Sequence, residues 1–192
     1  TDRVDFATFS GHKFHAVRGV GFVYKKAGKK ITPFLTGGGQ EKDLRSTTEN
    51  VAGIASMAKA LRLVTDKEEF SLPKIAKMKK IIFDELAKYE DITIFSGEGE
   101  DFAPNILTFG IKGVRGEVVV HAFEEHQIYI STTSACSSKA GKPAGTLISM
   151  GIPTKLAQTA VRISLDDDND MGQVEQFLTI FKQVYAKTQK VR

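Results

Sequence analysis

Hydrophobic residues recur along the chain with two spacings, which predict its strands and helices. Alternating apolar and polar positions are typical of strands, and apolar residues three or four positions apart are typical of helices. In the first half these patterns predict strands over 4–9 and 19–26, a glycine-rich loop over 34–47, and helices over 49–63 and 67–89. Pro73 is a candidate interruption of the second helix. The lysines at helical spacing near its middle predict a solvated face (Lys74, Lys77, Lys79 and Lys80).

From residue 92 onward, short strands alternate with helices, which is typical of an α+β domain. The predicted strands are 92–96, 105–111, 128–138 and 160–165, and the predicted helices are 116–126, 144–150 and 172–187. We expect the strands near 105, 128 and 160 to form one mostly antiparallel sheet with helices on one face. The acidic run DDDND is expected to be the solvated cap of the last helix.

Composition and charge argue against several kinds of protein, namely membrane-spanning, disulfide-bonded and nucleic-acid-binding ones. Of the 192 residues, 41% are hydrophobic and 26% are charged, which is typical of a globular protein. No apolar run approaches the roughly 18 residues of a membrane span, and no signal-peptide pattern opens the chain. Cys136 is the single cysteine, which excludes an internal disulfide and predicts a cytoplasmic location. The net charge of +4 is spread over scattered basic residues, so we expect no nucleic-acid binding.

The sequence also bears on metal binding and on where the chain begins. One cysteine and four histidines show no metal-ligand spacing, so no metal site is predicted. The chain begins at Thr1 without a methionine and runs directly into a strand pattern, so we expect an excised segment of a longer protein.

Lys13 is the first candidate for chemistry, because it follows the first predicted strand beside Ser10 and His12. A hydroxyl and an imidazole can bind an anion, and a lysine amine can form a Schiff base at the same place. The alternative interpretation is a set of polar residues in solvent at a strand end.

Three further features each leave two interpretations open. Cys136 is surrounded by small polar residues and Lys139, which suits a reactive thiol as well as an ordinary one. Arg162 lies inside an apolar strand, where it needs either an internal salt bridge or a bound carboxylate. The segment GGGQEKDLRSTTEN suits both a helix N-cap, with Asn50 as a candidate, and an anion site.

Five segments taken in order carry a resemblance to a known family. They are SGHK, GVGFVY, GGGQE followed three residues later by RSTTEN, SACSS, and VRISL. Together they resemble the aminotransferase class V family, and within it the NifS/IscS-like cysteine desulfurases. The resemblance covers essentially the whole chain. It implies an α/β pyridoxal-phosphate-dependent transferase of fold type I, represented by its C-terminal portion: a remnant of the large domain over 1–48, connecting helices over 49–91, and a small α+β domain over 92–192.

The resemblance also implies a cofactor and residues that hold it. Lys13 matches the lysine that binds pyridoxal 5'-phosphate, and Ser10 and His12 match residues that contact its phosphate. Thr48 matches a threonine that reaches the phosphate bound in the other subunit of a homodimer. Thr47 stands where the family motif has a glycine, so the loop of this chain differs from the family's loop at that position.

Substrate roles follow from the same resemblance. Arg162 matches the arginine that holds the substrate carboxylate, and Cys136 matches the cysteine that takes the sulfur as a persulfide. The implied reaction converts L-cysteine to L-alanine and passes sulfur to an acceptor protein. The alternatives are another class V enzyme, such as a selenocysteine lyase or an aminotransferase-like enzyme, and a non-catalytic dimerisation or sulfur-relay module. Because family members carry cofactor contacts upstream of this region, we expect the isolated segment to be inactive.

Overall fold

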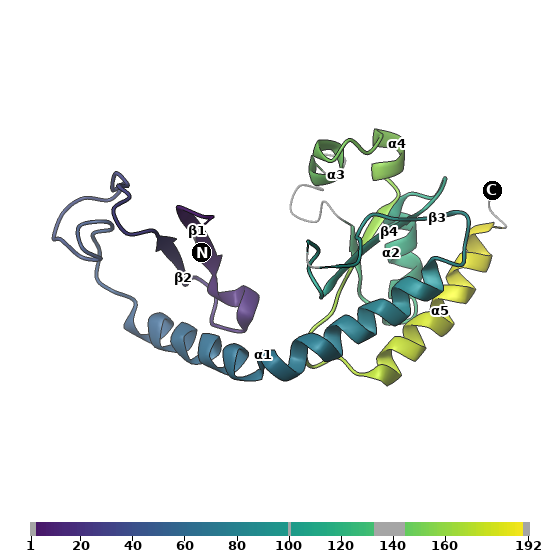
Figure 1. Cartoon of the computed structure of the whole chain (residues 1–192), viewed down its shortest axis with the longest axis horizontal. Helices are drawn as coiled ribbons and strands as arrows, with labels where there is room; N and C mark the ends of the chain where they lie inside the picture. The colour runs from purple at the N-terminus through teal and green to yellow at the C-terminus, as the bar shows by residue number, and fades with distance from the viewer. Residues whose placement is uncertain (1–2, 100, 133–144, 190–192) are drawn as a thin grey trace. The chain divides into compact units, whose positions relative to one another are not determined.

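The chain forms two compact units, Thr1–Glu69 and Phe70–Arg192. The computed structural model describes residues 3–99, 101–132 and 145–189. One helix, α1 (Val51–Leu86), begins in the first unit and ends in the second (Figure 1). None of the helices in these ranges combines the length and the apolar character needed to cross a lipid bilayer.

The first unit is built on a hairpin. Strands β1 (Phe6–Ser10) and β2 (Gly21–Lys25) pair antiparallel, and the 3₁₀ helix η1 (Gly11–Phe14) lies in the connection. The rings of Phe9 and Phe22 stack with their centroids 4.6 Å apart. Both predicted strands are therefore confirmed.

Helix α1 corrects the prediction of two helices over 49–63 and 67–89, because it is one helix of 36 residues that continues through 64–66 and also through Pro73. A proline inside a helix costs about 3 kcal/mol. The turns that follow bury the predicted apolar positions Ile75, Met78, Ile82 and Leu86, and each such side chain contributes about 1.5–3 kcal/mol. This packing exceeds the cost of the proline, so the helix continues.

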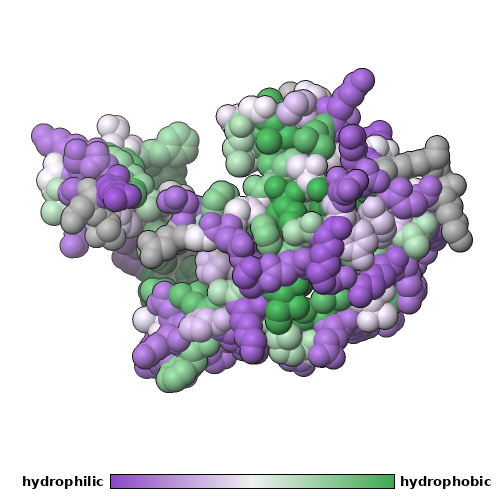
Figure 2. Space-filling model, turned by 45° about the vertical axis from the view of Figure 1, so that its right-hand side comes forward, coloured by the Kyte–Doolittle hydropathy of each residue, from purple (hydrophilic) through white to green (hydrophobic). Residues whose placement is uncertain are grey.

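The first half of α1 behaves differently from the second. Its predicted apolar stripe includes Val51 and Leu61, whose exposed fractions are 73% and 43%, whereas Ala60 is buried. Hydrophobic side chains that reach the surface appear green in Figure 2. The spacing predicts an apolar face, but it carries no information about what covers that face.

The second unit contains a four-stranded sheet in the order β3–β4–β6–β5. Its strands are β3 (Ile92–Ile94), β4 (Ile106–Ile111), β5 (Ser131–Thr132) and β6 (Ala160–Ser164). Every neighbouring pair is antiparallel, which confirms the predicted sheet. Of the strand predicted over 128–138, residues 128–130 are not part of a strand, β5 covers Ser131–Thr132, and 133–138 lies outside the described residues.

One face of this sheet packs into the main core. The second half of α1, α2 (Gly116–Glu124) and α5 (Met171–Gln189) supply the helical side of that core. Phe109, Val161, Phe123 and Phe181 are fully buried in it. The long helices therefore share one face, as predicted.

Two short helices depart from the prediction of helices on one face. Leu147 in α3 (Gly145–Ser149) and Ala157 in α4 (Thr154–Ala157) cluster with Phe95 and Ala160. Ala160 precedes Val161 in β6, and successive side chains of a strand point to opposite faces. The second face of the sheet therefore has its own small apolar cover at one end.

Lys79 is the exception to the predicted solvated lysine face, whereas Lys74, Lys77 and Lys80 are exposed as predicted. The exposed fraction of Lys79 is 6%, and its Nζ donates to the backbone oxygens of Gly97 (3.2 Å) and Ala103 (2.9 Å). Burial lowers the pKa of Lys79, and the nearby Glu98 carboxylate opposes that change. The buried ammonium ties the connection between β3 and β4 to α1.

The acidic run before α5 caps that helix, as predicted. The Asp170 carboxylate accepts from the Gln173 N–H (2.9 Å), and the Gln173 side-chain oxygen accepts from the Asp170 N–H (3.2 Å). This reciprocal pair is a capping box, which satisfies two backbone donors at the start of the helix.

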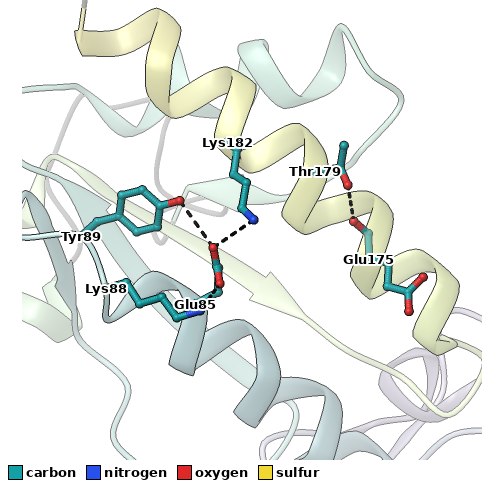
Figure 3. Close-up of polar contacts among 6 residues, drawn as sticks. All are labelled: Glu85, Lys88, Tyr89, Glu175, Thr179 and Lys182. Atoms are coloured by element: carbon teal, nitrogen blue, oxygen red, sulfur yellow. Dashed lines mark hydrogen bonds and ion pairs between the residues drawn. The ribbon is translucent and has the colours of Figure 1, made fainter.

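Glu85 connects α1 to α5. Its carboxylate pairs with Lys88 and with Lys182 of α5, whose Nζ lies 3.3 Å from Glu85 Oε1, and it accepts from Tyr89 Oη at 3.5 Å (Figure 3). Further along α5, the Thr179 hydroxyl donates to the Glu175 backbone oxygen. The hydrogen bond from Lys88, followed by the contribution of Lys182, lowers the pKa of Glu85.

Replacing Glu85 with Gln should destabilise the second unit by about 1 kcal/mol near neutral pH. Because the folded-state pKa of Glu85 is lowered, its contribution is complete above the ordinary value of 4.5. The contribution is then lost as the pH falls through the lower folded-state pKa. Urea unfolding followed by circular dichroism, from neutral to acidic pH, should show the wild-type and variant curves converging in acid.

The matched control for this measurement is Glu175→Gln on the exposed surface of α5. It should leave the free energy of unfolding unchanged at every pH. A Glu85→Gln deficit that stays constant into acid would contradict a role for the ionised carboxylate.

Candidate functional site

The turn that carries Lys13 follows β1 directly. Ser10 has an extended backbone and makes no side-chain capping bond, so its hydroxyl is not used to start η1. The Gly11 N–H donates to the Val20 oxygen at 2.8 Å, and His15, with φ of 69°, ends the turn in the left-handed region. These bonds fix the backbone on both sides of His12 and Lys13.

Two glycines make this close turn sterically feasible. A Cβ on Gly11 would lie 2.9 Å from the Val20 oxygen, and a Cβ on Gly21 would lie 2.3 Å from the Phe9 oxygen. Backbone atoms cannot move aside cheaply at such distances. Glycine at both positions therefore lets β1, η1 and β2 approach one another.

The side chains on this turn suit a phosphorylated aldehyde cofactor. Ser10, His12 and Lys13 are exposed, and within four residues they present a hydroxyl, an imidazole and a primary amine. The first two can donate hydrogen bonds to phosphate oxygens, and the amine can condense with a carbonyl. The structure brings these three predicted residues together.

Thr48 belongs to the same unit and lies, exposed, in the loop before α1. This loop contains three successive residues with positive φ, namely Glu41, Lys42 and Asp43. Its end is fixed by Asn50, whose side-chain oxygen accepts from the Gly53 N–H at 3.0 Å. The predicted N-cap is therefore confirmed.

Arg162 lies in the middle of β6, where it pairs with Thr108 of β4 on one side and Ser131 of β5 on the other. Its neighbours Val161 and Ile163 face the main core, so Arg162 faces the opposite side of the sheet. The Arg162 Nε is buried and has no hydrogen-bond partner. Among the described residues no carboxylate pairs with Arg162, so these residues do not supply the internal salt bridge.

The start of β6 is held tightly, which fixes the backbone position of Arg162. A Cβ on Gly110 would lie 2.1 Å from the Thr159 hydroxyl, and a Cβ on Gly116 would lie 2.7 Å from the Ala160 oxygen. The Gly116 N–H also donates to the Gln158 oxygen at 3.0 Å. Because Gly110 and Gly116 have no side chains, β6 packs closely against β4 and against the start of α2.

The remaining predicted site residue, Cys136, lies outside the described residues. Arg162 belongs to the second unit, whereas Ser10, His12, Lys13 and Thr48 belong to the first. Ser131, opposite Arg162, was not identified from the sequence. The alternation within a strand indicates which residues share a face, but only the strand register shows which residues lie opposite one another.

The chain matches the model of a known protein family. The model of aminotransferase class V matches residues 2–177 of this chain. Five sequence segments pointed to the same family, so the predicted resemblance is confirmed.

Two curated relatives are similar to this chain over most of its length. A "NifS/IcsS protein homolog" of Lactobacillus delbrueckii subsp. bulgaricus is 47% identical and aligns with all of this chain and 50% of its own length. A "Cysteine desulfurase IscS" of Dictyoglomus turgidum is 33% identical over 84% of this chain and 41% of its own length. The chain thus spans about half the length of the curated relatives it matches.

Solved structures establish the fold. A NifS-like protein from Rickettsia africae is similar with a TM-score of 0.82 and 32% identity, covering 95% of this chain and 48% of that chain. A second NifS-like protein gives a TM-score of 0.80 at 31% identity. The predicted fold class, part of a fold type I enzyme, is confirmed. The chain belongs to the aminotransferase class V family.

Proposed function

We propose that this chain is part of a pyridoxal-phosphate-dependent cysteine desulfurase, which converts L-cysteine to L-alanine. The observation that carries the proposal is the half-buried Arg162, which lies on the face of the sheet away from the main core and has no carboxylate partner among the described residues. An amino-acid carboxylate is the natural partner for a planar guanidinium. The names of the relatives support sulfur transfer as the chemistry.

The cofactor would be held by the turn after β1. Lys13 would bind it covalently, and Ser10 and His12 would donate to its phosphate. When bound, pyridoxal phosphate acts as an electron sink for bonds broken at the substrate. The exposed Lys13 amine is accessible for this linkage.

Arg162 would bind and orient the substrate. The Arg162 side chain is half-buried, so an ionic hydrogen bond to its guanidinium is partly shielded from water and is stronger than one in solvent. The backbone of β6 is fixed by Gly110 and Gly116, which reduces the freedom of the carboxylate that Arg162 holds.

Cys136 would receive the sulfur. Its thiolate forms an S–S bond to the substrate sulfur while the substrate C–S bond breaks, and the electron pair of that bond stays on carbon. A proton then adds to this carbon to give L-alanine. The persulfide on Cys136 passes its outer sulfur to the thiol of an acceptor protein, which restores the Cys136 thiolate.

The assembly and location follow from the same proposal. Thr48, exposed before α1, would reach the cofactor phosphate of a second subunit in a homodimer. The single cysteine of this chain suits the reducing cytoplasm, where a free thiolate persists.

Lys13→Ala should abolish the absorbance of the bound cofactor in a full-length enzyme that contains this chain, because no amine remains at the turn. Lys25→Ala is the matched control, since Lys25 lies on the adjacent strand and its Nζ donates to the Lys29 oxygen. Absorption spectra of both purified variants test this. Equal retention of the coloured species would exclude Lys13 as the cofactor lysine.

Cys136→Ala should eliminate alanine release and persulfide formation in the same enzyme while leaving cofactor binding intact. The thiolate is lost, but Lys13 and Arg162 remain. Alanine release, persulfide labelling and cofactor absorbance would be measured together. Unchanged alanine production from L-cysteine would favour another class V chemistry, such as a lyase or transaminase without a cysteine nucleophile.

A further inference from the structure

Three polar residues form a row across the second unit's sheet. Arg162 is opposite Thr108 on β4 and opposite Ser131 on β5 in the strand register. Paired residues of antiparallel strands lie on the same face with their Cβ atoms about 5 Å apart. Thr108, Arg162 and Ser131 therefore share the face that is turned away from the main core.

The two hydroxyl neighbours of Arg162 differ in their surroundings. Thr108 has an exposed fraction of 8%, and the segment after β3 pairs with its backbone: the Thr108 N–H donates to the Ser96 hydroxyl (2.8 Å), and the Thr108 oxygen accepts from the Phe95 N–H (2.8 Å). Ser131 is only half-buried and lies on β5, the last strand of the sheet. Of the two, Ser131 is the one that a small molecule can reach.

We propose that Ser131 is a second carboxylate-binding residue, which donates its hydroxyl hydrogen to the carboxylate held by Arg162. This inference rests on the proposed function, because it takes the Arg162 ligand to be an amino-acid substrate. A carboxylate has two oxygens, and the guanidinium and hydroxyl on neighbouring strands can donate to them from one face. Two donors on separate strands fix the orientation of the carboxylate as well as its position.

Thr132 offers a matched control for this role. It follows Ser131 in the same strand, but it pairs with Val161, which is buried in the main core. Its side chain therefore lies on the opposite face from Arg162. A change at Thr132 disturbs the same strand without touching the polar row.

The test uses a full-length enzyme that contains this chain and compares Ser131→Ala, Ser131→Thr, Thr132→Ser and Arg162→Lys. Ser131→Ala should raise the KM for L-cysteine and the dissociation constant of L-alanine about ten-fold, the loss expected for a hydrogen bond to a charged group. Its kcat should change little, and Ser131→Thr should restore binding. Thr132→Ser should match the wild type. The inhibition constant of cysteamine, which is L-cysteine without its carboxylate, should not respond to Ser131→Ala.

The outcomes separate this inference from the proposed function. If Arg162→Lys weakens L-cysteine and L-alanine binding but Ser131→Ala does not, the role of Ser131 is overturned and the Arg162 clamp stands. If Ser131→Ala weakens cysteamine as much as L-cysteine, its effect is structural and the inference is also overturned. If Arg162→Lys leaves both constants unchanged, the carboxylate clamp itself is wrong.

Discussion

The alternation of side chains along β6 is the constraint on which the rest of the structure depends. Val161 and Ile163 are buried in the main core together with Leu107 and Phe109 of β4. Each of these side chains contributes roughly 1.5–3 kcal/mol by burial, far more than one exposed ion pair could offset. Strand geometry then leaves Arg162 only the opposite face, where its Nε is buried without a partner. The packing of the apolar core therefore leaves the Arg162 guanidinium on the other face, where a bound carboxylate can pair with it.

Local patterns predicted much of this fold because the spacing of apolar residues is itself the physical cause of the elements. The buried positions Ile82 and Leu86 in α1 and Phe123 in α2 follow directly from helical spacing. The capping of α5 by Asp170 was predictable for the same reason, since it involves residues within one turn. Pro73, a candidate interruption of the second predicted helix, does not break α1, because the tertiary packing of the following turns exceeds the local penalty of the proline.

Ser10, His12 and Lys13 could be named as candidates from the sequence because a hydroxyl, an imidazole and an amine lie within four residues, and their roles stay a prediction. Contacts between distant residues could not be predicted in this way. Lys79 resembles its solvated neighbours in sequence, yet two carbonyl groups from the β3–β4 connection bind its ammonium. Ser131 opposite Arg162 depends on the register of β5, which no local pattern specifies.

We propose that the Arg162 guanidinium binds the substrate carboxylate. The most direct measurement is a crystal structure of a full-length enzyme that contains this chain, soaked with L-alanine. We predict a carboxylate oxygen within hydrogen-bond distance of the Arg162 guanidinium, on the face of the sheet shared with Thr108. A carboxylate bound elsewhere, with the Arg162 guanidinium paired to a protein carboxylate, would contradict this prediction.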